Sequence, residues 1–252
     1  MYYLSVLSQF KNEKHILKLW LDHHIWQGVK HFYLIDNGST DNPLQILQPY
    51  IQRGIVSYYY KPEPYSQVKN YRAVFAKDIW FKTYWLAVID MDEFLYGVNK
   101  RLVKQLRRLH GYNAIYCNWH MYGTSGCIKQ PRDVRLKNVH RLPELDPVNT
   151  KYIVKTTSIL HPSQLWIHWL FRPHTDVPIK EGKRIRVANK GIRLNHYLCQ
   201  SEEFFTKVKS VRGDATQPGT KWTREFFDNY KNSATLLDET LKNIVLKPPP
   251  KY

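Results

Sequence analysis

The sequence predicts an α/β protein with a mostly parallel central sheet flanked by helices. Strand-like apolar runs alternate with amphipathic, helix-like stretches over the first 120 residues. The apolar run at residues 85–89 stops abruptly at acidic residues, which is typical of a buried parallel strand that ends at a ligand-binding edge. A length of 252 residues, 43% of them hydrophobic, suits one packed domain.

The predicted elements follow the hydrophobic period along the chain. A strand over residues 2–7 leads to a helix over 13–26, in which Leu17, Trp20 and Leu21 share a face and after which Gly28 stops the helix. The later elements are a strand at 31–35, a helix from Pro43, a strand at 55–60, a helix at 65–81, a strand at 84–89, a basic helix at 99–110, a strand at 114–119, and helices at 202–211 and 223–241.

We expect residues 1–246 to form a single domain and residues 247–252 to trail off as a tail with three consecutive prolines. Within the domain, residues 1–99 are expected to bind a nucleotide, and residues 100–246 to bind an acceptor and close the site. Beyond residue 120 the pattern loosens into basic, strand-like pieces before the last two helices.

The charge is unevenly distributed. The chain has a formal net charge of +17, but residues 1–99 carry 10 Lys+Arg and 9 Asp+Glu, whereas residues 100–252 carry 28 and 12. Such a basic balance suggests an anionic partner: nucleic acid, a membrane surface or a phosphorylated ligand. The apolar content excludes wholesale disorder, and no apolar run approaches the roughly 20 residues that a membrane-spanning helix needs.

Cysteine usage and the start of the chain bear on location. Cys117, Cys127 and Cys199 form no CxxC pair, and residues 2–7 follow Met1 without a basic region or a long apolar region typical of a secretory signal. We therefore expect a reducing, cytoplasmic location, with peripheral binding to a membrane left open.

Three carboxylates lie close together after the predicted strand that ends at Ile89. Asp90, Asp92 and Glu93 would repel one another unless a cation or hydrogen-bond donors neutralise them. A hard divalent ion would do this and leave positions for phosphate oxygens. A strand-end turn with solvated acids is the alternative, and for an isolated tripeptide of this kind it is the more common one.

Two further polar segments follow strands of the same sheet. Residues 36–41, Asp-Asn-Gly-Ser-Thr-Asp, follow the second strand, and Asn12-Glu13 follows the first. Each segment alone could be a turn or a helix cap. Because the carboxyl ends of parallel strands meet at one edge of a sheet, we expect all three polar segments to converge there.

An ordered set of motifs resembles the family 2-like and family 92 glycosyltransferases of the GT-A fold. This fold is a Rossmann-like, mostly parallel sheet flanked by helices, and in this chain we expect it to end in basic C-terminal helices. The motifs span residues 4–212 and are Lys11-Asn12-Glu13, residues 32–41, residues 89–94, Asn118-Trp119 with residues 122–126, and residues 192–197. The resemblance implies transfer of a sugar from a nucleotide-sugar donor, with UDP as the expected nucleotide, to a glycan or other hydroxyl acceptor. It also implies a Mn²⁺ or Mg²⁺ cofactor and an inverting mechanism.

The same resemblance assigns residues by position. For the donor it gives Asn12, Glu13, Asp36, Asn37, Gln67, Tyr71, Asp90, Met91, Lys207 and Arg212, and for the metal it gives Asp90, Asp92 and His196. For the sugar and acceptor it gives Asn118, Trp119, Gly123 and Ser125. Core packing is an open alternative for His196 and Trp119. The pattern lacks the usual acidic pair for the catalytic base, and chemistry alone suggests Asp176 or Asp133.

Two other function classes compete with a glycosyltransferase. A nucleic-acid-binding protein would explain the basic residues Lys100, Arg101, Lys104, Arg107, Arg108, Lys180, Lys183, Arg184, Arg186, Lys190 and Arg193, although no known binding motif accompanies them. A nucleotidyltransferase could use the same acidic cluster. It would need a Gly-rich, basic loop near the amino terminus, and residues 5–11 contain no glycine.

Overall fold

The computed structural model describes residues 1–212 and 222–247, and the chain divides into two compact units. The first unit comprises Met1–Asn118 and Pro147–Leu194, and the second comprises Trp119–Asp146 and Asn195–Tyr252. The units interleave in the sequence, whereas the predicted nucleotide and acceptor parts are contiguous. The roles assigned to those parts stay predictions, and residues 248–252 of the predicted tail lie outside the described residues.

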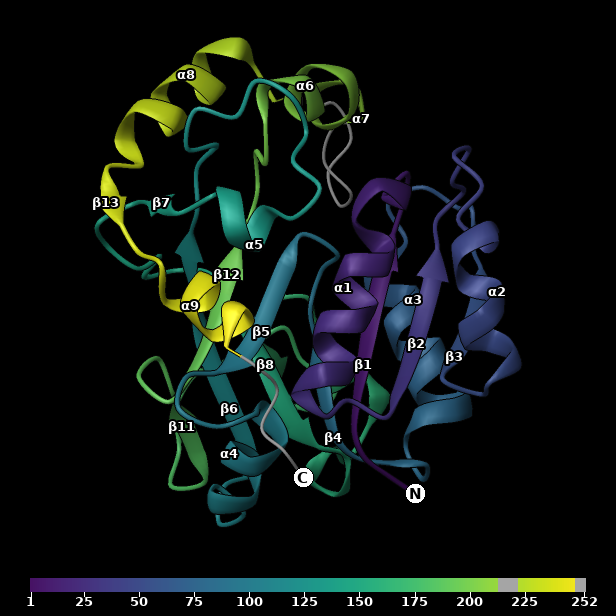
Figure 1. Cartoon of the computed structure of the whole chain (residues 1–252). Helices are drawn as coiled ribbons and strands as arrows, with labels where there is room; N and C mark the ends of the chain where they lie inside the picture. Colours follow the sequence, from purple (N-terminus) through teal and green to yellow (C-terminus); the bar gives the residue numbers. More distant parts are fainter. Residues whose placement is uncertain (213–221, 248–252) are drawn as a thin grey trace. The chain divides into compact units, whose positions relative to one another are not determined.

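A large mixed sheet organises the first unit (Figure 1). Its order is β3-β2-β1-β4-β8-β6-β12-β5, with β11 paired to β6. The strands are β1 Tyr2–Phe10, β2 His31–Asp36, β3 Val56–Tyr60, β4 Thr83–Val88, β5 Glu93–Gly97, β6 Ala114–Met121, β8 Thr150–Lys155, β11 Ile185–Val187 and β12 Ile192–His196. Strands β3, β2, β1 and β4 run parallel, while β8 runs antiparallel to β4 and β6.

The helices of the first unit are α1 Lys14–Gln27, α2 Leu44–Gln52, α3 Gln67–Val74, which continues as the π-helical turn η1 Phe75–Ile79, and α4 Leu102–Arg108. Short 3₁₀ turns, η2 Thr156–Ser158 and η3 Pro162–Gln164, and the two-residue strands β9 Leu170–Phe171 and β10 Pro178–Ile179 complete it. The predicted α/β alternation is confirmed over the first 120 residues. The sequence did not predict β5, because its first residue, Glu93, belongs to the acidic cluster.

Helix α1 shows how local chemistry positions the site. Its buried face includes Leu17, Trp20 and Leu21, as the periodicity predicts. It ends at Gly28, which adopts a left-handed conformation with φ of 101°. A Cβ at this glycine would lie 2.5 Å from a side-chain carbon of Val103. Both the left-handed backbone conformation and this close approach therefore exclude a larger residue at position 28.

The second unit contains the ends of β6 and β12, followed by short elements around a small aromatic core. The elements are α5 Val134–Lys137, β7 His140–Arg141, α6 Glu202–Phe204, the π-helical turn η4 Phe205–Lys209, α7 Ser210–Arg212, α8 Arg224–Ser233, β13 Leu236–Leu237 and α9 Thr240–Leu246. The core of this unit packs Met121, Leu198, Phe205, Phe227 and Tyr230 together.

The predicted single helix over residues 223–241 is wrong. Helix α8 ends at Ser233, and the chain then extends so that β13 pairs antiparallel with β7, through Leu236 opposite Arg141. The Arg141 guanidinium donates to Asp238 at 2.8 Å and fixes this extended segment. A tertiary pairing therefore overrides the local helical pattern.

The described residues contain no helix both long and apolar enough to cross a membrane. All three cysteines are free thiols, with Cys117 and Cys199 buried and Cys127 half-buried. Burial raises the pKa of the Cys117 thiol to about 12, so this thiol is unreactive near neutral pH.

Candidate functional site

The loops after β1 and β2 are bound to each other at the carboxyl-terminal edge of the sheet. Phe10 and Asp36, the last residues of these strands, are partners in the parallel register. The Asn12 amide donates to Ser39 Oγ at 3.0 Å, and the Thr40 amide donates to Asn12 Oδ1 at 2.8 Å. Two of the three polar segments predicted to converge at this edge therefore do so.

The start of α1 belongs to the same set of contacts. The first helical amide, at Lys14, donates to Asp41 Oδ2 at 2.8 Å, so an acid from the loop after β2 caps a helix that follows β1. Glu13 is buried, and its carboxylate lies 3.8 Å from the imidazole of His15. This capping fixes the position of the predicted donor residue Glu13.

Asp36 is a buried carboxylate, 2% exposed, held from two sides. The Ser39 amide donates to its Oδ1 and the Tyr58 hydroxyl donates to its Oδ2, both at 2.7 Å. Burial raises the pKa of Tyr58, and the Asp36 carboxylate raises it further, so this hydroxyl stays a donor. The side chain of Asn37 donates to the Lys61 carbonyl at 2.7 Å, which ties the loop to the end of β3.

The acidic loop Asp90–Glu93 joins β4 to β5 and is anchored by α1. The indole of Trp20 donates to the Glu93 carbonyl at 2.8 Å and lies 3.2 Å from the Asp90 carbonyl. Within the loop, the Asp90 amide donates to Glu93 Oε2 at 2.8 Å. Met91 and Asp92 are also buried, at 2% and 5% exposure. The third polar segment is thereby fixed to the same edge, where β4 neighbours β1.

A lysine from β8 partly neutralises this acidic loop. The Lys151 ammonium lies 2.6 Å from Asp90 Oδ2 and 3.9 Å from Glu93 Oε1, and its side chain is 1% exposed. Burial alone would lower the pKa of Lys151, but Asp90 and Glu93 raise it above its usual value, so the side chain stays charged. Burial raises the pKa of Glu93 well above its ordinary value, against the opposing effect of Lys151.

The predicted pair Gln67 and Tyr71 lies on α3 and joins this network. Gln67 Nε2 donates to the Tyr71 hydroxyl at 2.8 Å and lies 3.3 Å from Asp90 Oδ1. The Gln9 amide, near the end of β1, also donates to that hydroxyl, at 3.2 Å. Burial raises the pKa of Tyr71, and the Asp90 charge adds to the rise. Gln67, Tyr71, Asp90 and Lys151 thus form one hydrogen-bonded group.

In residues 1–212 and 222–247, no three His, Cys, Asp or Glu side chains are gathered as a metal cage. Such a cage is not what Mg²⁺ requires, because Mg²⁺ commonly binds one or two carboxylates together with substrate phosphates. Asp92 follows a parallel strand and supplies the hard oxygen that such an ion prefers. The donor set at this edge therefore fits an ion that binds together with a diphosphate.

Other predicted residues lie in the second unit. The His196 ring packs on Trp119, with ring centroids 4.4 Å apart. This contact is what the packing alternative predicts for both residues, and their roles toward metal and sugar stay predictions. Lys207 pairs with Glu203 at 3.0 Å across one helical turn and is 70% exposed, and Arg212 is half-buried at the end of α7.

Gly123 and Ser125 have structural contacts in the second unit. A Cβ at Gly123 would lie 2.6 Å from the Ala234 Cβ, so only glycine fits there. Ser125 has φ of 50°, and its Oγ accepts from the amides of Val139 and His140. Asn118, in the first unit, exchanges two hydrogen bonds with Asn189, at 2.7 and 3.0 Å. Contact of these residues with an acceptor stays a prediction.

The two candidate bases differ in their surroundings. Asp176 is exposed in the turn between β9 and β10. Asp133 precedes α5, accepts from the Arg135 amide at 2.9 Å and pairs with the Arg135 guanidinium at 2.6 Å. Asp133 is therefore held as a helix cap, and the role of either residue as the base stays a prediction.

Comparison with known proteins identifies the family. The model of "Glycosyltransferase family 92" matches residues 2–244. The chain belongs to glycosyltransferase family 92. A family 92 protein of Oryza sativa subsp. japonica is 26% identical over 218 residues, covering 83% of this chain and 35% of that protein. One of Ricinus communis is 26% identical over 232 residues, covering 85% and 38%. The chain thus spans little more than a third of the curated relatives it matches.

A solved structure agrees with the predicted fold. The crystal structure of S. aureus TarS 1-349 in complex with UDP-GlcNAc has a TM-score of 0.52 to this family 92 chain at 15% sequence identity, covering 97% of this chain and 70% of that one. The fold is of the GT-A type, as the sequence predicts, with a sheet that is flanked by helices and is parallel from β3 to β4 but antiparallel around β8.

Lys151 and Trp20 are the main parts of this edge that the sequence did not assign. Lys151 is the charged residue inside β8, whose other lysine, Lys155, is the last and less buried residue of the strand. A lysine in a strand buried along its length needs an anionic partner, and an unpaired acidic cluster needs a cation. These two requirements together could have indicated from the sequence that Lys151 pairs with the acidic loop. Trp20 gave no such signal, because it fits the apolar face of α1.

Proposed function

We propose that this family 92 chain transfers a sugar from a UDP-sugar donor to a hydroxyl group of a glycan or glycoconjugate. The observation that carries the proposal is the polar group at the carboxyl-terminal edge of β1, β2 and β4, where β2 supplies Asp36, α3 supplies Gln67 and the loop after β4 supplies Asp90 and Asp92. Ligands of open α/β sheets bind at this edge. The complex of TarS with UDP-GlcNAc supports a UDP-sugar as the donor class.

The donor's nucleoside would lie over the loops after β1 and β2. These loops are already joined through Asn12 and Ser39, and Asp36 is buried between Ser39 and Tyr58, so the backbone that meets the nucleoside is rigid before the donor binds. Preorganisation of this kind lowers the entropic cost of binding.

Asp92 and Asp90 would hold a Mn²⁺ or Mg²⁺ ion that binds together with the donor diphosphate. Even with Glu93 protonated, as its burial favours, the carboxylates of Asp90 and Asp92 outnumber the single positive charge of Lys151, so the loop can accept a further cation. Lys151 and Gln67 fix the Asp90 carboxylate at 2.6 and 3.3 Å. We assign the direct contact with the ion to Asp92, as the resemblance of this motif to the family implies. When bound, the ion would stabilise the charge that develops on the leaving diphosphate.

The reaction we propose is a single displacement with inversion at the anomeric carbon. The acceptor oxygen forms a bond to that carbon while the bond from the carbon to the diphosphate breaks, and the diphosphate leaves with the electron pair. The acceptor proton passes to a carboxylate, for which Asp176 and Asp133 are the candidates. The roles of Lys207 and Arg212 toward the leaving phosphates stay sequence-based predictions.

Thermal melting with and without Mn²⁺ across a panel of nucleotide sugars tests this function. A ligand that binds only the folded chain raises the melting temperature, and the rise grows with ligand concentration. We expect a UDP-sugar to stabilise the chain in the presence of the ion, and to be hydrolysed slowly when no acceptor is added. If no nucleotide sugar stabilises the chain at saturating concentrations, the donor assignment is wrong.

A further inference from the structure

The first unit has a second chemically distinct surface at the opposite end of its sheet. The parallel strands β1, β4, β6 and β11 begin there, and the antiparallel strand β8 ends there. We call this surface the amino-terminal edge, defined by Tyr2, Thr83, Ala114, Ile185 and Lys155. It faces away from the carboxyl-terminal edge, where the donor residues lie.

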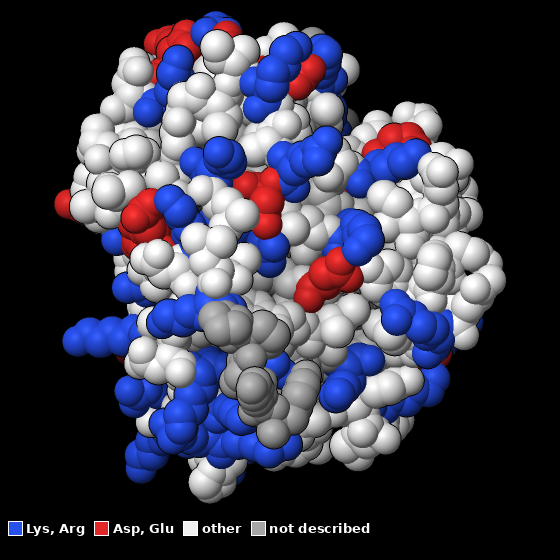
Figure 2. Space-filling view, in the orientation of Figure 1, with Lys and Arg blue, Asp and Glu red and all other residues white. Residues whose placement is uncertain are grey.

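Cations gather at the amino-terminal edge without acidic partners. Arg107 and Arg108 end α4, while Lys183 and Arg184 precede β11, and all four side chains are exposed. The Arg184 carbonyl accepts from the Asn113 amide at 2.7 Å, which joins the β11 segment to the chain that leads from α4 into β6. None of the four cations is ion-paired to an acid of the described chain. Figure 2 shows Lys and Arg gathered over α4 and β11 in the lower left of the view.

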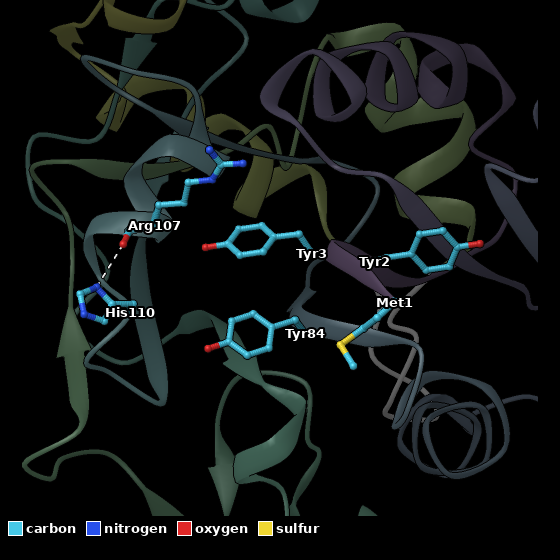
Figure 3. A pocket seen from close by; sticks show the side chains of 6 residues that line it. All are labelled: Met1, Tyr2, Tyr3, Tyr84, Arg107 and His110. Atoms are coloured by element: carbon cyan, nitrogen blue, oxygen red, sulfur yellow. Dashed lines mark hydrogen bonds between the residues drawn. The ribbon is translucent and has the colours of Figure 1, made fainter.

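Aromatic side chains line a pocket on the same surface (Figure 3). The rings of Tyr3 and Tyr84 stack with centroids 5.7 Å apart, and the Arg107 guanidinium lies 5.7 Å from the Tyr3 ring. The His110 imidazole lies 3.2 Å from the Arg107 carbonyl, and His110 is also one of the residues that line the pocket. Tyrosine beside cations is a combination suited to the boundary between apolar chains and charged headgroups.

Two large apolar side chains project from this edge into solvent. Phe81, just before β4, is 83% exposed, and Leu160, shortly after β8, is 74% exposed. The Tyr2 amide donates to the Lys82 carbonyl at 2.6 Å, and the Thr156 hydroxyl donates to the Thr83 carbonyl at 2.5 Å, so both apolar side chains lie on segments bound to the start of β4. Exposed apolar groups on the same edge as unpaired cations favour an interface that accepts both.

We propose that the amino-terminal edge docks on a bilayer that contains anionic phospholipids. A bilayer surface attracts the four cations through its headgroups and accepts Phe81 and Leu160 at the headgroup and acyl boundary. Nucleic acid would also attract the cations, but its phosphates give the apolar side chains no partner. Docking at this edge leaves the carboxyl-terminal edge free for a donor.

Co-sedimentation with phosphatidylcholine vesicles, with and without phosphatidylglycerol, tests the proposal. Each cation near an anionic surface contributes about fivefold to partitioning, so Lys183→Gln/Arg184→Gln should weaken binding by about 30-fold. The matched control, Lys69→Gln/Lys231→Gln, removes two exposed cations elsewhere and should bind nearly as wild type does. Phe81→Ser should weaken binding by about tenfold without changing the melting temperature.

Binding to phosphatidylglycerol vesicles that weakens at high salt and falls in both edge variants, but not in the control, would support the proposal. Equal loss in the control pair, or no binding to anionic vesicles, would overturn it. Tighter binding to DNA or RNA than to vesicles, with Phe81→Ser unchanged, would also overturn it and assign the edge to nucleic acid. These readouts do not depend on sugar transfer, so they can fail while the proposed function holds.

Discussion

Replacing Lys151 with methionine tests whether its ammonium neutralises the acidic loop. The substitution keeps a long apolar side chain in β8 but removes the charge that lies 2.6 Å from Asp90 and 3.9 Å from Glu93. Glu93 is fully buried, and burial raises the pKa of its carboxyl well above the ordinary value. Without Lys151 the charge that opposes this rise is lost, so the protonated form is favoured further. Asp90 is 28% exposed, so water offsets part of its loss.

Removing one partner of a buried pair costs about 3–5 kcal/mol, and the exposure of Asp90 places this case near about 3 kcal/mol. For a chain of this size that corresponds to a fall in melting temperature of about 6–12 °C. The exposed Lys69→Met on α3 is the matched control and should change stability by less than about 0.5 kcal/mol.

Calorimetry or urea unfolding measures the effect, and a double-mutant cycle with Asp90→Asn isolates the pair. We expect the cycle to give a coupling of about 1 kcal/mol or more between Lys151 and Asp90. A Lys151→Met variant as stable as the Lys69 control would refute the neutralisation of the loop by Lys151. So would a cycle with no coupling.

Two further predictions concern other parts of the chain. In the native protein Cys127 should react with a thiol reagent, whereas the buried Cys117, whose pKa burial raises to about 12, should react only after denaturation, as mass spectrometry of the labelled peptides would show. In the second unit, the Gln130 amide and the Lys207 ammonium lower the pKa of Glu203 from 4.5 to about 2. The ionised Glu203 carboxylate therefore stabilises the folded chain above about pH 4.5, and this stabilisation disappears as the pH falls toward 2. The difference in melting temperature between wild type and Glu203→Gln should therefore shrink over that range, and a difference independent of pH would contradict the assignment.

Much of the first unit could be predicted because its central strands are recognisable as apolar runs in the sequence. The buried runs that became β1, β2 and β4 are continuous in the sequence, and the polar residues that follow them meet because parallel strands share an edge. The resemblance of residues 32–41 and 89–94 to known glycosyltransferases points to the same edge. The family match confirms the class of enzyme to which the chain is related.

What the sequence could not supply are contacts between distant segments. Lys151 is 61 residues from Asp90. The sequence around each residue indicates that it needs a partner of opposite charge, but it does not say which residue that partner is. The break between α8 and β13 likewise depends on β7, about a hundred residues earlier, and on the bond from Arg141 to Asp238. Local periodicity does not predict such pairings, so the helix predicted over residues 223–241 extends beyond Ser233, where α8 ends.

Nucleotide-sugar binding by wild type and by Asp92→Asn tests the central claim most directly. Calorimetric titration with UDP-sugars in the presence of Mn²⁺ should show binding by wild type and at least tenfold weaker binding by the variant, because a carboxylate that meets a diphosphate-bound ion would be lost. Asp228→Asn, the same change on the exposed face of α8, should bind as wild type does. Undiminished binding by Asp92→Asn, or no binding of any UDP-sugar by the folded wild type, would contradict the account.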